Sequence, residues 1–109
     1  MEQFVIDLKY IKDDIPIGHV EICSNKENFN VGLVWISNLY VEVSYRHKGI
    51  GTKLMNRAID TCKKLSITKL YLYCKPELIP FYKRFGAEDA NQEMNGYNLM
   101  VVNFEQNGN

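Results

Sequence analysis

The middle of this chain runs from an apolar segment through a glycine turn into an amphipathic segment, and this succession constrains the fold more than any other feature. Residues 31–43 are apolar at both odd and even positions, as in a strand that is covered on both faces. Gly49 and Gly51 follow, and apolar side chains then recur at helical spacing up to Leu65. A short apolar strand is expected over 69–74. The segment therefore predicts a strand–helix–strand unit whose two strands are parallel neighbours.

The flanking segments predict further strands and a second helix around this unit. Alternation of apolar and polar residues predicts further strands over 4–10, 18–23 and 96–104. Pro76 is expected to begin a short helix that Gly86 ends, with a kink in its first turn at Pro80. A length of 109 residues with 46% hydrophobic residues suits one domain with one core. We therefore expect an α/β (α+β) fold over residues 1–109, with two helices beside a mixed sheet and a loose tail at 104–109.

The same patterns predict which side chains are buried. The expected core face of the first helix consists of Ile50, Leu54, Ala58, Cys62 and Leu65. Its expected solvent face consists of Lys53, Arg57, Asp60 and Lys64. Strict alternation along the central strand places Leu33, Trp35, Leu39 and Val41 on one face, and Val34, Ile36 and Tyr40 on the other.

Positive charge is concentrated in the middle of the chain, although the formal net charge is zero. Residues 46–84 carry ten lysines and arginines against two acids. Residues 1–45 carry three lysines against seven acids, and residues 85–109 carry four acids and no base. This distribution suggests an anion that binds in the middle of the chain, although solvated helix faces produce the same pattern.

Other features narrow the class of protein. The three cysteines, Cys23, Cys62 and Cys74, have no paired or metal-ligand spacing, which predicts reduced thiols in a cytoplasmic protein and no metal. We predict no signal peptide and no membrane partner, because the chain lacks a basic-then-apolar start and any apolar run near the roughly 20 residues that span a bilayer. No standard nucleic-acid motif is present, so no nucleic-acid partner is expected.

The glycine turn has the composition of a phosphate-binding loop. Its residues are Arg46, His47, Lys48, Gly49, Ile50, Gly51 and Thr52. The two glycines let the backbone approach a ligand, and the amides at the start of a helix attract an anion such as a pyrophosphate. The turn is neither a P-loop, because Lys53 follows Thr52, nor a dinucleotide fingerprint, because Leu54 replaces the third glycine. The alternative is a turn that only connects strand and helix.

Two segments resemble a known family. Leu39-Tyr40-Val41 followed by Tyr45-Arg46-His47-Lys48-Gly49-Ile50-Gly51 resembles the acyl-CoA-binding signature of the GNAT superfamily of N-acetyltransferases. Residues 72–87 resemble its second motif, a strand followed by a helix that ends in Tyr-x-x-x-Gly-Phe. The resemblance covers residues 3–104 and implies the acyl-CoA N-acyltransferase fold, a mixed, mostly antiparallel sheet in which a central parallel pair splays around the cofactor.

The resemblance also implies an activity. Acetyl-CoA would be the co-substrate, without a metal, and its acetyl group would pass to a primary amine of a small molecule or a protein by direct attack on the thioester. Backbone groups of Leu39, Tyr40 and Val41 would pair with the pantetheine arm, and one of these amides would polarise the thioester carbonyl. Amides of 47–52 would hold the pyrophosphate, with Arg46 beside them.

Tyr82 matches the tyrosine that commonly protonates the leaving thiolate in this superfamily. A phenol with its ordinary pKa near 10 can donate a proton to a developing thiolate. The alternative is a packed aromatic residue beside Phe81 and Phe85. His19, Glu21 and Glu42 are candidates for the general base, but each is better explained as a surface or strand-edge group. Cys74 is interpreted as a buried, inert cysteine rather than an acylated thiol.

The chain departs from the superfamily's pattern in three places. It begins near the position of the second strand, so we expect no counterpart for the preceding strand and two helices, of which the helices usually form one wall of the acceptor pocket. We expect an open acceptor site, a site completed by a second copy in a homodimer, or a site for a large acceptor such as a protein terminus. Lys75 stands where many relatives have Asn, and Ala87 stands where Phe usually follows Gly86.

Two further hypotheses concern the role of the chain. The acidic flanks favour a cationic acceptor such as a polyamine, an aminoglycoside or lysine. The alternative to an enzyme is a non-catalytic regulatory module that binds acyl-CoA, for which the missing acceptor wall is the main argument.

Overall fold

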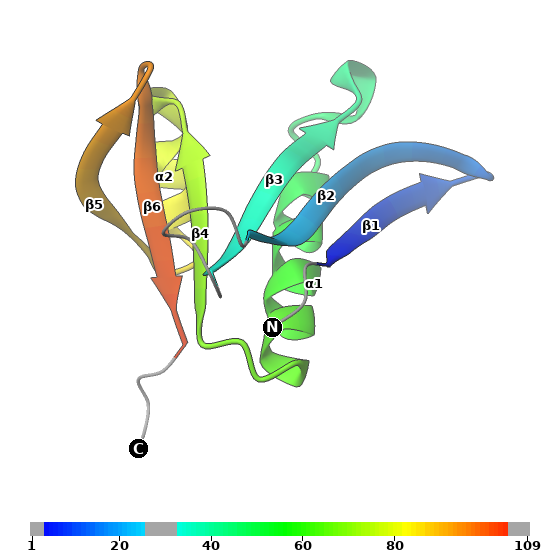
Figure 1. The fold of residues 1–109 in the computed structure, drawn as a ribbon. Helices are drawn as coiled ribbons and strands as arrows, with labels where there is room; N and C mark the ends of the chain where they lie inside the picture. Colours follow the sequence, from blue (N-terminus) through cyan, green and yellow to red (C-terminus); the bar gives the residue numbers. More distant parts are fainter. Residues whose placement is uncertain (1–3, 26–32, 105–109) are drawn as a thin grey trace.

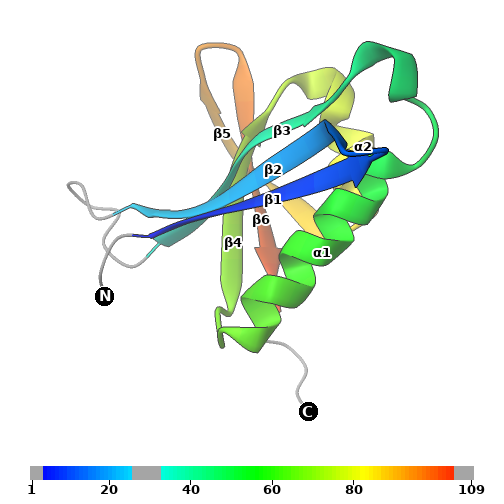
Figure 2. The same ribbon diagram turned by 90° about the vertical axis from the view of Figure 1, so that its right-hand side faces the viewer.

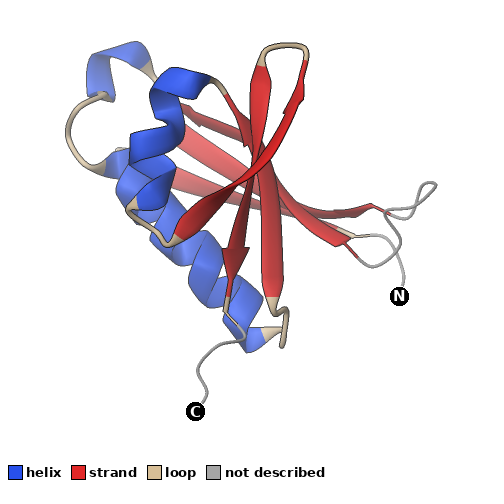
Figure 3. Ribbon diagram, turned by 90° about the vertical axis from the view of Figure 1, so that its left-hand side faces the viewer, coloured by secondary structure: helices blue, strands red, loops and turns tan. Residues whose placement is uncertain are grey.

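Six strands form one sheet in the order β1-β2-β3-β4-β6-β5 in the computed structural model, which describes residues 4–25 and 33–104. The strands are β1 (Val5–Lys12), β2 (Ile15–Asn25), β3 (Leu33–Val41), β4 (Lys69–Cys74), β5 (Ala87–Met94) and β6 (Tyr97–Asn103). The helices are α1 (Ile50–Lys64) and α2 (Ile79–Lys83), with short 3-10 turns η1 (Val43–Tyr45) and η2 (Pro76–Leu78). Both α-helices lie on the same side of the sheet (Figures 1 to 3).

The central strands β3 and β4 are parallel and separate soon after they meet. They are in register at a single position, where Trp35 lies opposite Tyr71, and every other pair of neighbouring strands is antiparallel. Figure 1 shows the two strands diverging toward their C-terminal ends. The predicted mixed sheet with a splayed parallel pair is therefore confirmed.

A bulge in β3 changes which side chains face the core. His19 pairs with Tyr40 and Glu21 pairs with Ser37, so one residue of β2 lies opposite two residues of β3. Asn38, one of the two, has a positive φ of 56°. An extra residue of this kind reverses the alternation of side chains beyond it.

The reversal corrects the prediction for the central strand. Leu39 and Val41 pack against the same core as Val34 and Ile36, whereas the predicted alternation placed them on the opposite face. Tyr40 is exposed and its ring lies 6.1 Å from the ring of His19. The prediction that both faces are covered was also wrong for this end of the strand. The first two residues of the predicted strand, 31–32, lie outside the described residues.

The amphipathic pattern of α1 correctly predicted most of its core face. Ile50, Leu54, Ala58 and Cys62 are buried, and Met55, which the pattern did not include, is buried as well. The predicted solvent face is exposed. Leu65 is the exception, with 52% of its surface exposed. The helix ends at Lys64, so Leu65 occupies the C-cap and leaves the core face.

The edge strand β5 was missed, because five of the eight residues of Ala87–Met94 are polar and the apolar ones do not alternate with them. Its pairing with β6 depends on a hairpin at Asn95 and Gly96, both with positive φ. An Asn-Gly pair is a strong hairpin signal, and this was the local feature that could have revealed the strand. β1 and β2 are longer than predicted and meet at a turn formed by Asp13 and Asp14, which also have positive φ.

The second helical segment is divided into two parts. Pro76 begins η2, and α2 starts three residues later with Pro80 in its first turn, where a missing N–H is tolerated. The expected kink is thus a junction between the 3-10 turn and α2. Gly86 ends the segment with φ +86°, and its N–H donates to the Lys83 carbonyl at 3.0 Å. Within the described ranges, neither helix has the length and apolar character needed to cross a membrane.

Candidate active site

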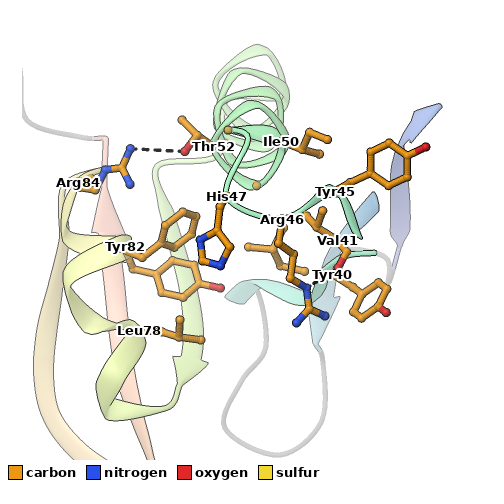
Figure 4. A pocket seen from close by; sticks show the side chains of 14 residues that line it. Tyr40, Val41, Tyr45, Arg46, His47, Ile50, Thr52, Leu78, Tyr82 and Arg84 are labelled. Carbon is orange, nitrogen blue, oxygen red and sulfur yellow. Dashed lines mark hydrogen bonds between the residues drawn. The ribbon is translucent and has the colours of Figure 1, made fainter. Parts of the chain in front are cut away.

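A cavity of about 640 Å³ opens where β3 and β4 diverge. Its walls come from the end of β3, from the turn before α1, and from the segment of η2 and α2 (Figure 4). The lining residues are Leu39, Tyr40, Val41, Tyr45, Arg46, His47, Gly49, Ile50, Gly51, Thr52, Leu78, Phe81, Tyr82 and Arg84. Segments that are far apart in the sequence therefore meet around one space.

The cavity brings together the predicted catalytic tyrosine and all the predicted cofactor-binding residues except Lys48. The Lys48 ammonium lies outside the lining and 5.8 Å from the centre of the Tyr45 ring. Four lining residues were not predicted: Tyr45, Leu78, Phe81 and Arg84. Helical spacing from Tyr82 points to Leu78, four residues earlier, whereas Phe81 and Arg84 do not lie at such a spacing from it.

The turn at the start of α1 leaves backbone amides available to a ligand. Gly49 is the N-cap residue with φ +83°, and no side chain caps the helix by a hydrogen bond. A Cβ added at Gly49 would meet no atom within 4 Å. The first amides of a helix have no partner within the helix, and the helix dipole makes this end favourable for an anion. His47, with φ +64°, precedes this position and also lines the cavity.

Arg46 connects the turn to the end of β3. Its Nε donates a hydrogen bond of 2.7 Å to the Val41 carbonyl, and its guanidinium carbon lies 5.2 Å from the centre of the Tyr40 ring. The cation and the ring therefore form a second contact besides the hydrogen bond. The arginine holds the strand end and the glycine turn together at one side of the cavity.

Tyr82 is nearly buried, with 7% of its surface exposed. Its ring packs edge-on against Phe81 with centroids 5.0 Å apart, and Figure 4 shows its hydroxyl pointing into the cavity. Burial raises the pKa of this phenol to about 12, and the neighbouring Cys74 thiolate adds to the increase. The hydroxyl therefore carries its proton throughout the neutral range and is a hydrogen-bond donor there.

Cys74 is buried at the end of β4 and is not part of the cavity lining. Burial raises the pKa of its thiol, and the charge of Asp89 raises it further. A thiol of this kind is protonated near neutral pH and is a poor nucleophile. The geometry accordingly fits the interpretation of Cys74 as an inert, packed residue.

The three candidate bases lie outside the lining of the cavity. His19 is half-buried beside Tyr40, which does line it. The Glu21 carboxylate accepts hydrogen bonds from Asn38 at 2.9 Å and Ser37 at 3.4 Å. Glu42 is exposed as the residue before η1. The structure therefore gives none of the three a place against the cavity.

Solved structures with this arrangement of strands and helices include acyl-CoA N-acyltransferases. The PaiA N-acetyltransferase of Thermoplasma acidophilum, solved in complex with coenzyme A, has a TM-score of 0.75 at 22% identity, covering 91% of this chain and 60% of that one. An acyl-CoA N-acyltransferase of Pseudomonas aeruginosa has a TM-score of 0.79 at 21% identity, covering 90% and 67%. The fold is therefore that of the acyl-CoA N-acyltransferases.

Sequence comparison identifies the family. The profile of the acetyltransferase (GNAT) family matches residues 2–87, and this chain belongs to that family. The N-alpha-acetyltransferase 50 of Danio rerio is 32% identical over 89 residues, which cover 78% of this chain and 52% of the relative. The chain spans about half the length of the curated relatives it matches.

Proposed function

We propose that this protein transfers an acetyl group from acetyl-CoA to a primary amine. The observation that carries the proposal is one cavity that contains both an uncapped helix N-terminus and the hydroxyl of Tyr82. The first suits a pyrophosphate, and the second is a proton donor. The helix N-terminus and the hydroxyl lie in one cavity where β3 and β4 diverge. This arrangement suits a ligand that has a diphosphate at one end and a thioester at the other.

Different residues of the chain would hold different parts of such a ligand. Amides of 47–52 would hold the diphosphate, because the dipole of α1 and the nearby Arg46 both favour negative charge. Backbone groups of Leu39, Tyr40 and Val41 would bind the pantetheine arm along the strand end that β4 leaves unpaired. An amide of this segment, placed beside the thioester carbonyl, would stabilise negative charge on its oxygen.

Tyr82 would supply the proton that the departing thiolate needs. The phenol is neutral near pH 7 both at its ordinary pKa and at its raised pKa, so the proton is present when charge develops on sulfur, and solvent returns a proton to Tyr82 after the thiol has left. The acetyl group itself comes from the thioester, which is the activated form of the acid. The amine must reach the carbonyl as the free base, and water is a sufficient relay for its proton if none of the three candidate bases acts.

The identity of the acceptor is a separate proposal. The acidic ends of the chain favour a cationic amine such as a polyamine. Competition at low salt between a polyamine and an anionic amine tests this, and faster acetylation of the anionic amine would contradict it. The cytoplasmic location and the homodimer remain predictions.

Calorimetric titration with acetyl-CoA tests the cofactor. We expect one-to-one binding, and we expect Gly49→Asp to raise the dissociation constant at least about tenfold, because it places a carboxylate where a phosphate belongs. Gly96→Asp is a matched control, since Gly96 has φ +84° and open space around it but lies in the β5–β6 turn. Equal effects of the two variants, or no binding by the unchanged protein, would contradict the assignment.

A panel of amines then tests turnover. Release of free thiol that depends on the amine supports the transferase. Binding of acetyl-CoA without transfer to any amine would instead favour the regulatory module, which shares the cavity but needs no proton donor.

A further inference from the structure

Gly18 is a buried glycine of β2 that lies against both the end of β3 and the start of α1. Its φ is not in the left-handed region, where Gly49, Gly86 and Gly96 lie, so its backbone conformation does not require glycine. A glycine inside a strand weakens the strand, and it often marks a position that another segment approaches closely. The space around Gly18 is therefore the property that distinguishes it.

Two segments approach Gly18 closely. A Cβ added there would lie 3.1 Å from the Tyr40 carbonyl oxygen, 3.1 Å from Cδ1 of Leu54 and 3.4 Å from Cγ2 of Ile50. Non-bonded carbon atoms pack best at roughly 3.5–4.0 Å, so each of these contacts is tight. The Leu54 methyl group can move aside, whereas the Tyr40 carbonyl belongs to the backbone of β3. A side chain at Gly18 would therefore displace the end of β3 and the start of α1 relative to each other.

The same two segments form part of the candidate active site. Tyr40 and Ile50 both line the cavity, whereas Gly18 and Leu54 do not (Figure 4). Tyr40 belongs to the strand end that would bind the pantetheine arm, and Ile50 belongs to the turn that would bind the diphosphate. Gly18 thus contacts one residue of each ligand-binding segment without facing the ligand.

Backbone contacts hold the end of β3 against β2 at this position. Gly18 lies opposite Val41 in the register of the two strands, and the Glu42 N–H donates a hydrogen bond of 2.8 Å to the Ile17 carbonyl. The Arg46 side chain joins the Val41 carbonyl to the glycine turn. Because these contacts restrict the movement of β3, a side chain at Gly18 has no free space to occupy, and the displacement reaches the cavity.

We propose that Gly18 is a positioning residue, which sets the spacing between the segment that binds the pantetheine arm and the segment that binds the diphosphate. This inference rests on the proposed function, because it concerns how the same ligand is held. A CoA molecule spans both segments, so its affinity depends on their spacing as well as on the contacts within each. A ligand that occupies one segment alone does not depend on that spacing.

Titration of the full chain with CoA and with its two halves tests the proposal. Pantetheine is the half that would bind the end of β3, and 3′-phosphoadenosine 5′-diphosphate is the half that would bind the glycine turn. We expect Gly18→Val to raise the dissociation constant of CoA about tenfold, and Gly18→Ala to raise it less, because valine adds more volume at a packed position. The constants of the two halves should stay within about twofold of their original values. Calorimetry measures CoA, and NMR titration follows the more weakly bound halves.

Ala58→Val is the matched control, because Ala58 is fully buried in α1 and does not line the cavity. It also adds volume to the core, but about two turns of helix beyond Ile50. Urea unfolding measures the stability of each variant, and Gly18→Ala decides the question if Gly18→Val does not fold. Equal weakening of CoA by Ala58→Val would overturn the proposal in favour of a general effect of overpacking.

The two halves of CoA distinguish spacing from local damage. If one half is weakened as much as CoA itself, the substitution has distorted a single segment, and the proposed role in spacing is overturned. A variant that is merely less stable would weaken all three ligands by the same factor, which also contradicts the proposal.

The outcomes separate this proposal from the proposed function. An unchanged dissociation constant for CoA in the folded Gly18 variants would remove the role of Gly18 and leave the acyl-CoA site intact. Failure of the unchanged protein to bind CoA would remove both.

Discussion

The Nε of Arg46 donates a hydrogen bond of 2.7 Å to the carbonyl oxygen of Val41, five residues earlier in the chain. This contact fixes the position of the glycine turn relative to the end of β3. The two segments that would bind the diphosphate and the pantetheine arm are therefore joined by one side chain. The arginine has a structural role at the site in addition to its charge.

Replacement of Arg46 by lysine separates these two roles. Lysine keeps the positive charge but is a flexible point charge, so the directed bond to Val41 and the contact with Tyr40 are weakened. We expect Arg46→Lys to weaken acetyl-CoA binding about tenfold, measured by calorimetry. Arg57→Lys, on the exposed face of α1, should leave binding unchanged. An unchanged dissociation constant in Arg46→Lys would show that charge alone matters at this position.

Tyr82→Phe removes the proposed proton donor and keeps the ring that packs on Phe81. We expect turnover to fall about 10²-fold, within the range for general acid catalysis, with little change in CoA affinity. Steady-state rates and calorimetry on the same preparation check both parts. Wild-type turnover in Tyr82→Phe would leave the tyrosine as a packing residue and remove its catalytic role.

The cysteines should differ in reactivity because they differ in burial. Cys62 and Cys74 are buried and Cys23 is half-buried. Burial raises the pKa of Cys62 to about 11, and burial followed by the charge of Asp89 raises that of Cys74. At about pH 8 we expect a thiol reagent to modify Cys23 first, and the two buried thiols only after unfolding. Mass spectrometry of the native protein checks this, and early modification of Cys62 would contradict it.

The raised pKa of Cys62 also predicts a dependence of stability on pH. An unfolded chain loses this thiol proton near the ordinary value of 9.0, whereas the folded chain keeps it up to about 11. Deprotonation therefore favours the unfolded state, and the contribution of Cys62 to stability is complete below about pH 9 and is lost as the pH rises toward about 11. Between about pH 9 and pH 11, the free energy of unfolding measured in urea should fall less for Cys62→Ala than for the unchanged protein. An equal loss in both would contradict the assignment.

Leu54 in α1 and Leu65 at its C-cap test where the core ends. Leu54 is 3% exposed and Leu65 is 52% exposed, although one apolar pattern includes both. We expect Leu54→Ala to lower the free energy of unfolding by about 2–5 kcal/mol, because it opens a cavity in the core. Leu65→Ala should cost less than about 1 kcal/mol. Chemical denaturation of the two variants measures the difference, and comparable losses would contradict the exposed position of Leu65.

Local patterns predicted the features that depend on neighbours in the chain. The glycine turn, the core face of α1 and the parallel pair follow from hydrophobic spacing and from the conformational freedom of Gly49. The composition of the glycine turn pointed to binding residues at 46–52, and the resemblance to the GNAT superfamily added 39–41; all of these residues except Lys48 line the cavity. Their roles toward acetyl-CoA remain predictions. The polar strand β5 was missed because nothing in its own composition indicates burial or pairing.

The amino-acid sequence by itself determined the class of the fold and the location of the glycine turn, since both depend on short-range periodicity and backbone sterics. Only the tertiary structure decided that a bulge at Asn38 turns Leu39 and Val41 toward the core, and that Arg84 reaches Thr52 from another helix. These features depend on strand register and on the packing of segments distant in the chain. Such contacts are selected by the global burial of apolar surface, which no local window of sequence contains.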